Sequence, residues 1–417
     1  MKTLDKWTLT TIEQCCEILD SKRIPINTED RKKRIGDIPY YGANGLQGYI
    51  DDFIFNEPLI LIAEDGGRFD EYATHPIAYR INGKSWVNNH AHVLRAKRGF
   101  CQDAIFYNLE HKDIRSFIVG GTRTKLNQSA LRKIKIFLPT SKLEQAKIAE
   151  ILSTIDFTIE QTEALIAKQQ RIKTGLIQDL LTRGIDEHGN LRSEQTHKFK
   201  DSQLGRIPVE WDVKRWRQVC KKIQDGTHFS PQTDSTAEFK YITSKNIKFG
   251  FMDLKEIEYI NRAQHDEIYK HCDVQQGDVL LTKDGVNTGN AAINPLREEF
   301  SLLSSVVFIR PMKNMLLSEF LLQSILSESG QRLIKDAMSG LAITRITLSI
   351  INDFLLKIPP IQEQQCIGQI LSKQDSLIKL EIDKLSKLRS LKTALMQDLL
   401  TGRKRVTPLL NETEVAG

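Results

Sequence analysis

Two segments of the chain carry apolar side chains at a heptad spacing. In residues 144–182 and 363–401, Ile or Leu fills seven of ten positions that alternate between steps of four and three residues. Neither segment contains proline, which would interrupt a helix. A 3.5-residue period sustained over about five heptads is typical of a coiled-coil seam. The predicted seam residues are Ile148, Leu152, Ile155, Ile159, Ile166, Leu176 and Leu180 in the first helix, and Ile367, Leu371, Ile378, Leu385, Leu388, Leu395 and Leu399 in the second.

The two heptad segments are copies of one another. At an offset of 219 residues, seventeen of the 39 paired positions are identical, far more than chance would give. The repeat extends outward, because Gly120 and Lys125 match Gly340 and Arg345 at an offset of 220 residues. A duplication of this kind predicts the order domain, helix, domain, helix.

The globular segments alternate short apolar runs with turn residues. Runs such as 59–63 and 279–282 are bounded by Gly, Asn and Asp, a pattern that predicts β-strands joined by tight turns. Helical patterns follow at Ala104–Val119 and Ser318–Ser339. Both segments are therefore predicted to be α+β.

These patterns divide the chain into six parts. The predicted parts are a globular domain at 1–140, a long helix at 141–183, a linker at 184–197, a second globular domain at 198–360, a second long helix at 361–402 and a tail at 403–417. The linker is polar and punctuated by glycine, and we expect the tail to be loosely ordered.

The composition favours a cytoplasmic protein. No apolar run reaches about 18 residues, which argues against a membrane span, and the first residues do not resemble a secretory signal peptide. None of the six cysteines forms a C-x-x-C pair, so buried reduced thiols are expected rather than disulfides or a metal site. A net charge of +6 is compatible with a phosphate-bearing partner, although many proteins that never bind DNA are as basic.

Several motifs resemble those of a known family. The motifs are Tyr40–Ile50 (YYGANGLQGYI), Leu61–Gly67 (LIAEDGG), Gly120–Asn127 (GGTRTKLN), Phe199–Trp211, Gly277–Gly285 and Pro359–Gln364. Over nearly the whole chain, and in the same order, they resemble the specificity (S, or HsdS) subunits of type I restriction-modification systems.

The resemblance implies a fold and a function. It implies two α/β target-recognition domains joined by two long antiparallel coiled-coil helices, with pseudo-twofold symmetry. Each domain would read one half of a bipartite, asymmetric double-stranded DNA site, and the helices would set the gap between the halves. The helices would also dock two methyltransferase (M) subunits, to which nuclease-translocase (R) subunits add. S-adenosylmethionine, ATP and Mg²⁺ are expected on these partners, with no cofactor on this chain and no membrane.

Candidate DNA contacts are cations and amides in predicted loops. Arg31, Lys32 and Lys33 form a basic loop that could contact phosphates or simply be solvated. Glycines near Tyr41 and Asn44 could admit a phosphate or could form hairpin turns. Arg123, Lys125 and Arg345 could face DNA or form salt bridges to the helix bases. Lys245, Lys283 and Asn287 carry side chains suited to base edges or phosphates, or could be ordinary loop residues.

Catalytic and metal signatures are missing from the sequence. Gly83-Lys84-Ser85 imitates the end of a Walker A loop, but Ala78 stands where that loop needs glycine. The Asp/Asn-Pro-Pro-Tyr/Phe motif of adenine methyltransferases does not occur, and a metal role for His92 is disfavoured. A non-catalytic DNA-binding subunit is therefore the leading hypothesis. A self-contained nuclease or methyltransferase, and a coiled-coil adaptor with two protein-binding heads, are the alternatives.

Overall fold

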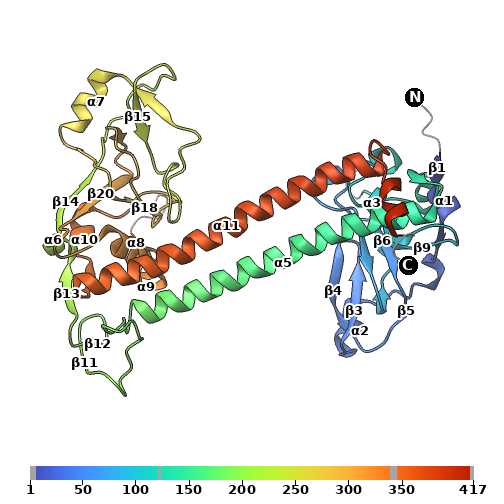
Figure 1. Cartoon of the computed structure of the whole chain (residues 1–417), viewed down its shortest axis with the longest axis horizontal. Helices are drawn as coiled ribbons and strands as arrows, with labels where there is room; N and C mark the ends of the chain where they lie inside the picture. The colour runs from blue at the N-terminus through green and yellow to red at the C-terminus, as the bar shows by residue number, and fades with distance from the viewer. Residues whose placement is uncertain (1–5, 121–123, 339–344, 414–417) are drawn as a thin grey trace. The chain divides into compact units, whose positions relative to one another are not determined.

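The computed structural model describes residues 6–120, 124–338 and 345–413 (Figure 1). The chain divides into two compact units, one made of Met1–Ala164 and Asp383–Gly417 and the other of Leu165–Ile382. The long helices α5 (Lys142–Leu180) and α11 (Ile361–Leu400) each contribute one part to each unit. Among the described residues, no helix combines the length and the apolar character that crossing a membrane requires.

In its described residues, the first unit contains two four-stranded sheets and one strand pair. One sheet has the order β2-β9-β6-β7, and its strands are Cys16–Ile18, Ala91–Ala96, Leu59–Ala63 and Ala78–Ile81. The other has the order β4-β3-β8-β5, with strands Gly45–Ile50, Ile38–Gly42, Lys84–Val87 and Phe55–Asn56. Strand β1 (Trp7–Thr11) pairs with β10 (Lys135–Pro139).

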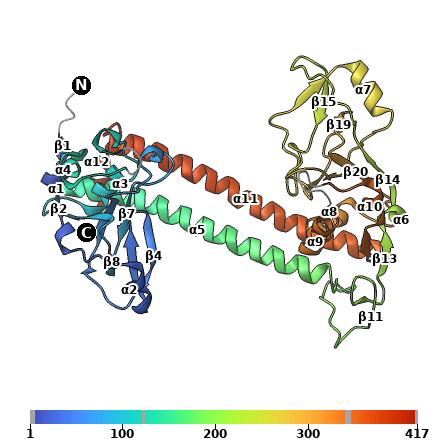
Figure 2. The same ribbon diagram turned by 180° about the vertical axis from the view of Figure 1, so that it is seen from behind.

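Short helices complete this unit. They are α1 (Ile12–Cys15), α2 (Thr28–Lys33), α3 (Gln102–Glu110), α4 (Gln128–Lys133) and α12 (Thr407–Thr413), with 3₁₀ turns at Asp20–Lys22, Phe69–Glu71 and Arg115–Phe117. Helix α1 packs against α4 (Figure 2). The backbone N–H of Ile12 donates to the carbonyl of Ile134.

Strand β6 explains why a continuous apolar run forms the centre of this unit. Ile60 and Ile62 pack into the core that α3 and α5 cover, whereas Leu59 and Leu61 pack on the opposite face with residues of the second sheet. Successive side chains of a strand point to opposite faces, so a strand covered on both faces needs apolar residues at every position.

The second unit repeats this plan. Its main sheet has the order β14-β20-β17-β18, with strands Cys220–Asp225, Val306–Pro311, Val279–Thr282 and Ala291–Ile293. The other strands are β11 (Phe199–Lys200) with β12 (Ile207–Pro208), β13 (Asp212–Arg215) with β21 (Leu355–Ile358), and the sheet β16-β15-β19 (Glu258–Ile260, Phe239–Ile242 and Ser301–Leu302). Its short helices are α6 (Trp216–Val219), α7 (Arg262–Tyr269), α8 (Ser318–Leu326), α9 (Glu328–Asp336) and α10 (Leu348–Asp353).

The two units share the elements that the duplication predicts. The main sheets have matching strand orders, and both units pair an early strand with the strand that precedes a long helix. The mixed α+β class and the internal repeat are therefore confirmed.

The long helices run antiparallel within each unit. In the first unit, Arg389 pairs with Glu163 at 2.6 Å, and Lys392 pairs with the earlier Asp156 at 2.8 Å. In the second, the Gln374 amide donates to the Gln169 side chain at 2.7 Å, and the earlier Glu363 accepts from the N–H of Ile185, which follows α5, at 2.9 Å. Of the fourteen predicted seam residues, Ile148, Leu152, Ile155, Ile166, Leu180, Ile367, Leu371 and Leu399 are buried, and Ile159, Leu176, Ile378, Leu385, Leu388 and Leu395 are half-buried.

Repeated Glu-Gln pairs fix the start of each long helix. Glu144 at the start of α5 accepts from Arg405, which follows α11, at 2.5 Å. Glu363 at the start of α11 accepts from Arg192, which follows α5, at 2.6 Å. Gln145 donates to the carbonyl of Pro139, which ends β10, and Gln364 donates to the carbonyl of Pro359, which directly follows β21. The duplication therefore reproduces one junction at the base of both helices.

Three expectations need correction. The predicted helix Ala104–Val119 ends at Glu110, and Ser318–Ser339 is divided into α8 and α9, because Ser327 leaves the helix and caps α9 through the N–H of Gly330. The tail is not loosely ordered at 403–413, since it forms α12, buries Val406 and holds Arg405 in the junction.

Candidate nucleic-acid interface

Three loops of the first unit meet beside the carboxyl end of β6. The Asn44 amide of the β3–β4 hairpin donates to the Gly66 carbonyl at 3.0 Å. The backbone N–H of Leu126 donates to the Glu64 carbonyl at 2.7 Å. Lys125, between these loops, lies 3.1 Å from a Glu64 carboxylate oxygen with 46% of its side chain exposed. The structure thus brings together the predicted residues Asn44 and Lys125.

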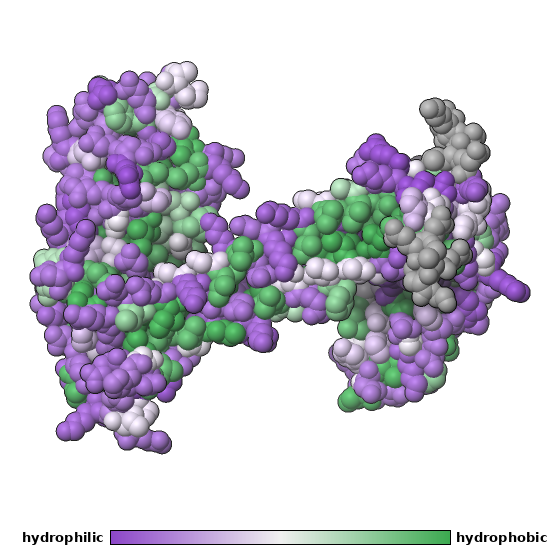
Figure 3. All heavy atoms as spheres, viewed as in Figure 1, coloured by the Kyte–Doolittle hydropathy of each residue, from purple (hydrophilic) through white to green (hydrophobic). Residues whose placement is uncertain are grey.

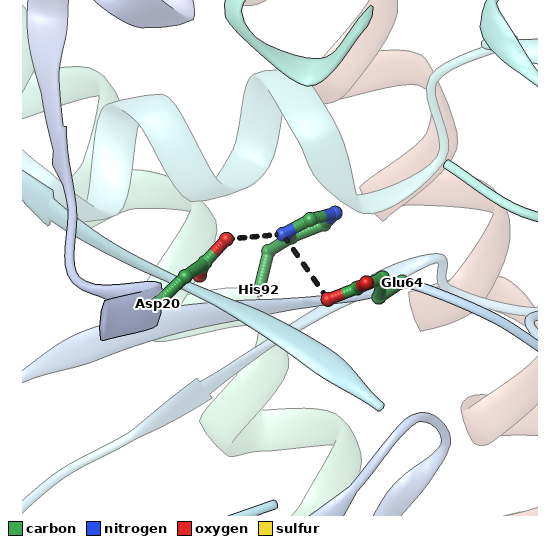
Figure 4. Close-up of side chains that lie close together, drawn as sticks. All are labelled: Asp20, Glu64 and His92. Carbon is green, nitrogen blue, oxygen red and sulfur yellow. Dashed lines mark hydrogen bonds and ion pairs between the residues drawn. The ribbon is translucent and has the colours of Figure 1, made fainter. Parts of the chain in front are cut away.

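A buried polar cluster supports these loops (Figure 4). The Nδ1 atom of His92 lies 2.6 Å from an Asp20 carboxylate oxygen, and its Nε2 atom lies 2.7 Å from the Leu126 carbonyl. Both ring nitrogens therefore face oxygen atoms that can accept hydrogen bonds. His92 ties the segment that carries Lys125 to the sheet.

Asp20, Glu64 and His92 could also be considered as metal ligands, since their ligand atoms lie within 4.8 Å of one another. Their hydrogen-bonding capacity is already used, however. Glu64 accepts from Arg23 at 2.8 Å and pairs with Lys125, and Arg23 also lies 3.7 Å from Asp20. These side-chain cations supply the positive charge that an ion would bring, so the geometry favours a charge-compensated network over a metal site.

Hydrogen bonds and neighbouring positive charges lower the pKa of both carboxyl groups. Burial alone would raise the pKa of Asp20, but the hydrogen bond and the charge of His92 outweigh it and hold the pKa below its ordinary value. Hydrogen bonds from Arg23 and Lys125 likewise outweigh burial and lower the pKa of Glu64. Carboxylates held in this state are poor general acids.

The second unit uses the same backbone frame with different polar residues. The N–H of Ile346 donates to the Lys283 carbonyl at 3.0 Å, as Leu126 does to Glu64. Lys283 thus occupies the place of Glu64. In the strand register, Leu281 faces Val307 where Ile62 faces His92, so a valine replaces the histidine.

Lys283 is an internal residue of this frame. Its side chain is 2% exposed, and its ammonium nitrogen lies 3.1 Å from Asp284 and 3.5 Å from Asp225. This burial contradicts the expectation that Lys283 faces DNA. A lysine ion-paired in this way stabilises the loop from beneath.

Other predicted residues of the second unit lie at the surface near this loop. The Asn287 amide donates to the Ser244 carbonyl at 3.3 Å, which ties the 283–290 loop to the loop that carries Lys245. The Lys245 side chain is 82% exposed. Arg345, the repeat partner of Lys125, is 57% exposed and lies 3.7 Å from Asp284.

The basic segment of the first unit was expected to be a loop, but it is helical. Arg31, Lys32 and Lys33 lie in α2, which begins with the side chain of Asn27 as its cap. The Arg31 guanidinium stacks over the Tyr40 ring at 4.8 Å. The remaining predicted residues are Tyr41, which lies in β3 and whose pKa is raised by burial, and Arg123, which lies outside the described residues.

Sequence reasoning missed Asp20 and Arg23 and gave His92 no role. Asp20 and His92 are separated by 72 residues in the chain, and no local pattern links them. The repeat offset places Glu64 opposite Lys283, and this was the one signal that could have marked the site. Among the cysteines, four are buried as expected, whereas Cys366 is exposed and Cys101 is intermediate.

Comparison with known proteins identifies the family. Residues 5–170 and 208–390 match the family described as "Type I restriction modification DNA specificity domain". A putative type I restriction enzyme specificity subunit of Haemophilus influenzae is 26% identical over 376 residues, covering 88% of this chain and 87% of the relative. The type I restriction enzyme MjaVIII specificity subunit of Methanocaldococcus jannaschii is 23% identical over 428 aligned residues, covering 98% and 95%.

The fold agrees with this match. The crystal structure of a type I restriction-modification system S subunit from M. genitalium superposes with a TM-score of 0.65 at 16% identity, covering 96% of this chain and 98% of that chain. The two matched regions together span most of the sequence. The chain therefore belongs to the family of type I restriction-modification DNA specificity subunits.

Proposed function

We propose that this chain recognises a bipartite, asymmetric DNA sequence, with one half-site read by each unit. The proposal rests on one observation, which is that the two units share a backbone arrangement but carry different side chains at matching positions. Glu64 and His92 in one unit correspond to Lys283 and Val307 in the other, on matching strands and hydrogen bonds. A shared frame lets both units approach DNA in the same way, while different side chains select different bases.

The charges near the loops support contact with a DNA backbone. Lys125 and Arg345 occupy equivalent places, and both are substantially exposed. Cations at repeated positions suit the regular spacing of phosphates, whereas base selection requires residues that differ between the units.

We further propose that the chain catalyses nothing itself and directs adenine methylation and ATP-dependent cleavage by partner subunits. The carboxylates of Asp20 and Glu64 are paired with cations, which leaves them unsuited to hold a catalytic metal. Burial raises the pKa of the Cys220 and Cys272 thiols to about 12, which makes both poor nucleophiles. S-adenosylmethionine, ATP and Mg²⁺ would then act on the partners.

The long helices are the proposed docking sites for two methyltransferase (M) subunits, to which nuclease-translocase (R) subunits add. Apolar side chains reach the surface along both helices (Figure 3). Phe157 is 61% exposed and Leu391 48% exposed in the first unit, and Leu380 is 63% exposed in the second. Apolar residues that stay exposed on the surface of a protein are typical of protein interfaces when they form contiguous patches.

The test is to produce the chain alone and together with its methyltransferase partner, and to map methylated adenines in host DNA. We expect a motif split by a non-specific spacer, methylated only when both proteins are present. Methyl transfer by the pure chain would refute the non-catalytic role. Binding by the assembled complex that depends on neither sequence nor salt would favour the adaptor hypothesis instead.

A further inference from the structure

The β17–β18 hairpin of the second unit presents a rigid loop. The N–H of Gly289 donates to the Thr282 carbonyl at 2.9 Å, and the N–H of Thr288 donates to the Gly285 carbonyl at 3.1 Å. Gly285 has a φ of +82°, which glycine adopts without strain. Because buried Lys283 holds the base of the loop, the tip is fixed before any ligand arrives.

An apolar side chain stands at this tip. Val286 is 102% exposed, so its side chain packs against essentially none of the residues that the structure describes. The loop is tied to polar residues on both sides of this tip: the amide of Asn287 donates to the carbonyl of Ser244, which precedes Lys245, and Asp284 lies 3.7 Å from Arg345. Lys245, Asn287 and Arg345 all belong to the proposed DNA-facing surface. A β-branched side chain has few rotamers and therefore loses little entropy when it is bound.

We propose that Val286 contacts the C5-methyl group of a thymine in the major groove of the half-site read by the second unit. This inference rests on the proposed function. The base edges in the major groove present hydrogen-bonding groups, and the thymine methyl is the apolar group among them that a valine recognises. The fixed tip and its flanking cations present Val286 as a specificity-determining residue.

The first unit has no counterpart to this side chain. Its equivalent loop reads Asp65-Gly66-Gly67, where the second unit has Asp284-Gly285-Val286, and Gly66 has a positive φ of +65° as Gly285 does. A Cβ atom added to Gly67 would lie 2.6 Å from the Cβ of Ala63. The thymine-methyl contact is therefore expected in one half-site alone.

The test uses the complex of this chain with its methyltransferase partner. After the methylated motif has been mapped, each thymine of a duplex carrying it is replaced in turn by deoxyuridine, which lacks the methyl group. With the natural chain, one replacement should weaken binding about four-fold, the effect of one buried methyl group. The Val286→Ala complex should bind the thymine duplex about four-fold more weakly than the natural complex does. Replacing the same thymine by deoxyuridine should not weaken binding by this variant any further.

Val209→Ala provides the matched control, because Val209 is also exposed but lies outside the loop. It should leave every deoxyuridine effect unchanged. The inference is overturned if Val286→Ala keeps the full deoxyuridine effect at every thymine, or if the mapped motif contains no thymine on either strand of its specified bases. A complex without any sequence preference would instead overturn the proposed function, so the two failures are distinguishable.

Discussion

At the scale of single residues, the two units differ in the sign of the charge that supports their loops. Glu64 binds Arg23 and Lys125, whereas Lys283 binds Asp225 and Asp284. A buried charge is tolerated only when it is paired, so both partners must change together when the sign changes. This coupling lets the loop surface diverge while the backbone frame is kept.

The Asp20–His92 pair should make the first unit sensitive to acid. Asp20→Asn leaves His92 facing an amide, and we expect a loss of about 2–4 kcal/mol in stability at neutral pH. Since the folded-state pKa of Asp20 is lowered, its stabilisation is present above the ordinary carboxyl pKa of about 3.9 and is lost as the pH falls through the lower folded value. The difference between variant and natural chain should therefore shrink below about pH 4.

The stability of the first unit can be measured by hydrogen exchange of the β9 peptide in urea. Repeating the measurement between neutral and acid pH checks the predicted pH dependence. The exposed Asp37 serves as the control position, and Asp37→Asn should change stability by less than about 0.5 kcal/mol. An Asp20→Asn deficit that stays constant down to acid pH would contradict the assignment.

Removing the charge of Lys245 should weaken DNA binding, whereas removing the charge of Lys283 should lower the stability of the second unit. Lys245→Ala, at an exposed position, should weaken DNA binding by the complex equally for all sequences and reduce the slope of log K against log salt by about one. Lys283→Met leaves two carboxylates without their cation and should destabilise the second unit by about 3 kcal/mol. Salt titrations of binding and urea unfolding of each variant separate the two effects.

Sequence alone could not distinguish these two lysines. Both stand in predicted loops beside polar residues. Lys283 differs because it forms a buried ion pair with Asp225, which lies 58 residues earlier in the chain, and no local pattern shows that contact. Of the candidate site, Asn44, Lys125, Lys245, Asn287 and Arg345 were placed in loops that the structure brings together within their units. The His92 network was not predicted, because its partners come from distant strands and turns.

At the scale of elements, the junctions at the helix bases are the strongest repeated feature. Glu363 accepts from Arg192, from the Trp211 indole at 3.1 Å and from the backbone N–H of Ile185 at 2.9 Å, all in buried surroundings. Glu363→Gln removes the charge that these donors share. We expect the second unit to lose about 3 kcal/mol of stability, with faster hydrogen exchange at 184–192 and at the start of α11.

An exposed ion pair gives the matched control for this junction. Glu328 pairs with Arg332 at 2.7 Å on the surface of α9, with side chains 83% and 69% exposed. Glu328→Gln should cost less than about 1 kcal/mol, because water screens such pairs. Equal losses in the two variants would show that the junction is not a buried charge pair.

Elements with a clear pattern of apolar residues were predicted from the sequence, whereas elements that depend on tertiary contacts were not. Strands β6 and β17 and both long helices follow their apolar patterns closely. The parallel pairing of β3 with β8 has no local signature, since it joins Tyr40 to Trp86. Helix α12 was missed because its stabilisation comes from Arg405 and Val406 packing against the first unit.

At the scale of the whole molecule, the proposed function makes the length of α5 and α11 a determinant of the DNA site. Both are unbroken helices of 39 and 40 residues that take part in both units. Each added residue lengthens a helix by about 1.5 Å, whereas each base pair lengthens DNA by about 3.4 Å and also rotates it. A heptad insertion keeps the apolar seam in register. It therefore lengthens the helix, while nearly the same face of the helix still points toward its partner helix.

Insertion of one heptad after Ala164 and another before Asp383 should therefore abolish binding to the natural site. It adds about 10 Å, or three base pairs, which turns the second half-site through roughly a third of a helical turn. Three heptads at both places add about 32 Å, close to one turn of DNA, and should restore binding to a site whose spacer is about nine base pairs longer. Affinities for duplexes of graded spacer length, measured with the methyltransferase complex, check both outcomes. Tight binding of the one-heptad variant to the natural spacer would show that the helices do not set the distance between half-sites.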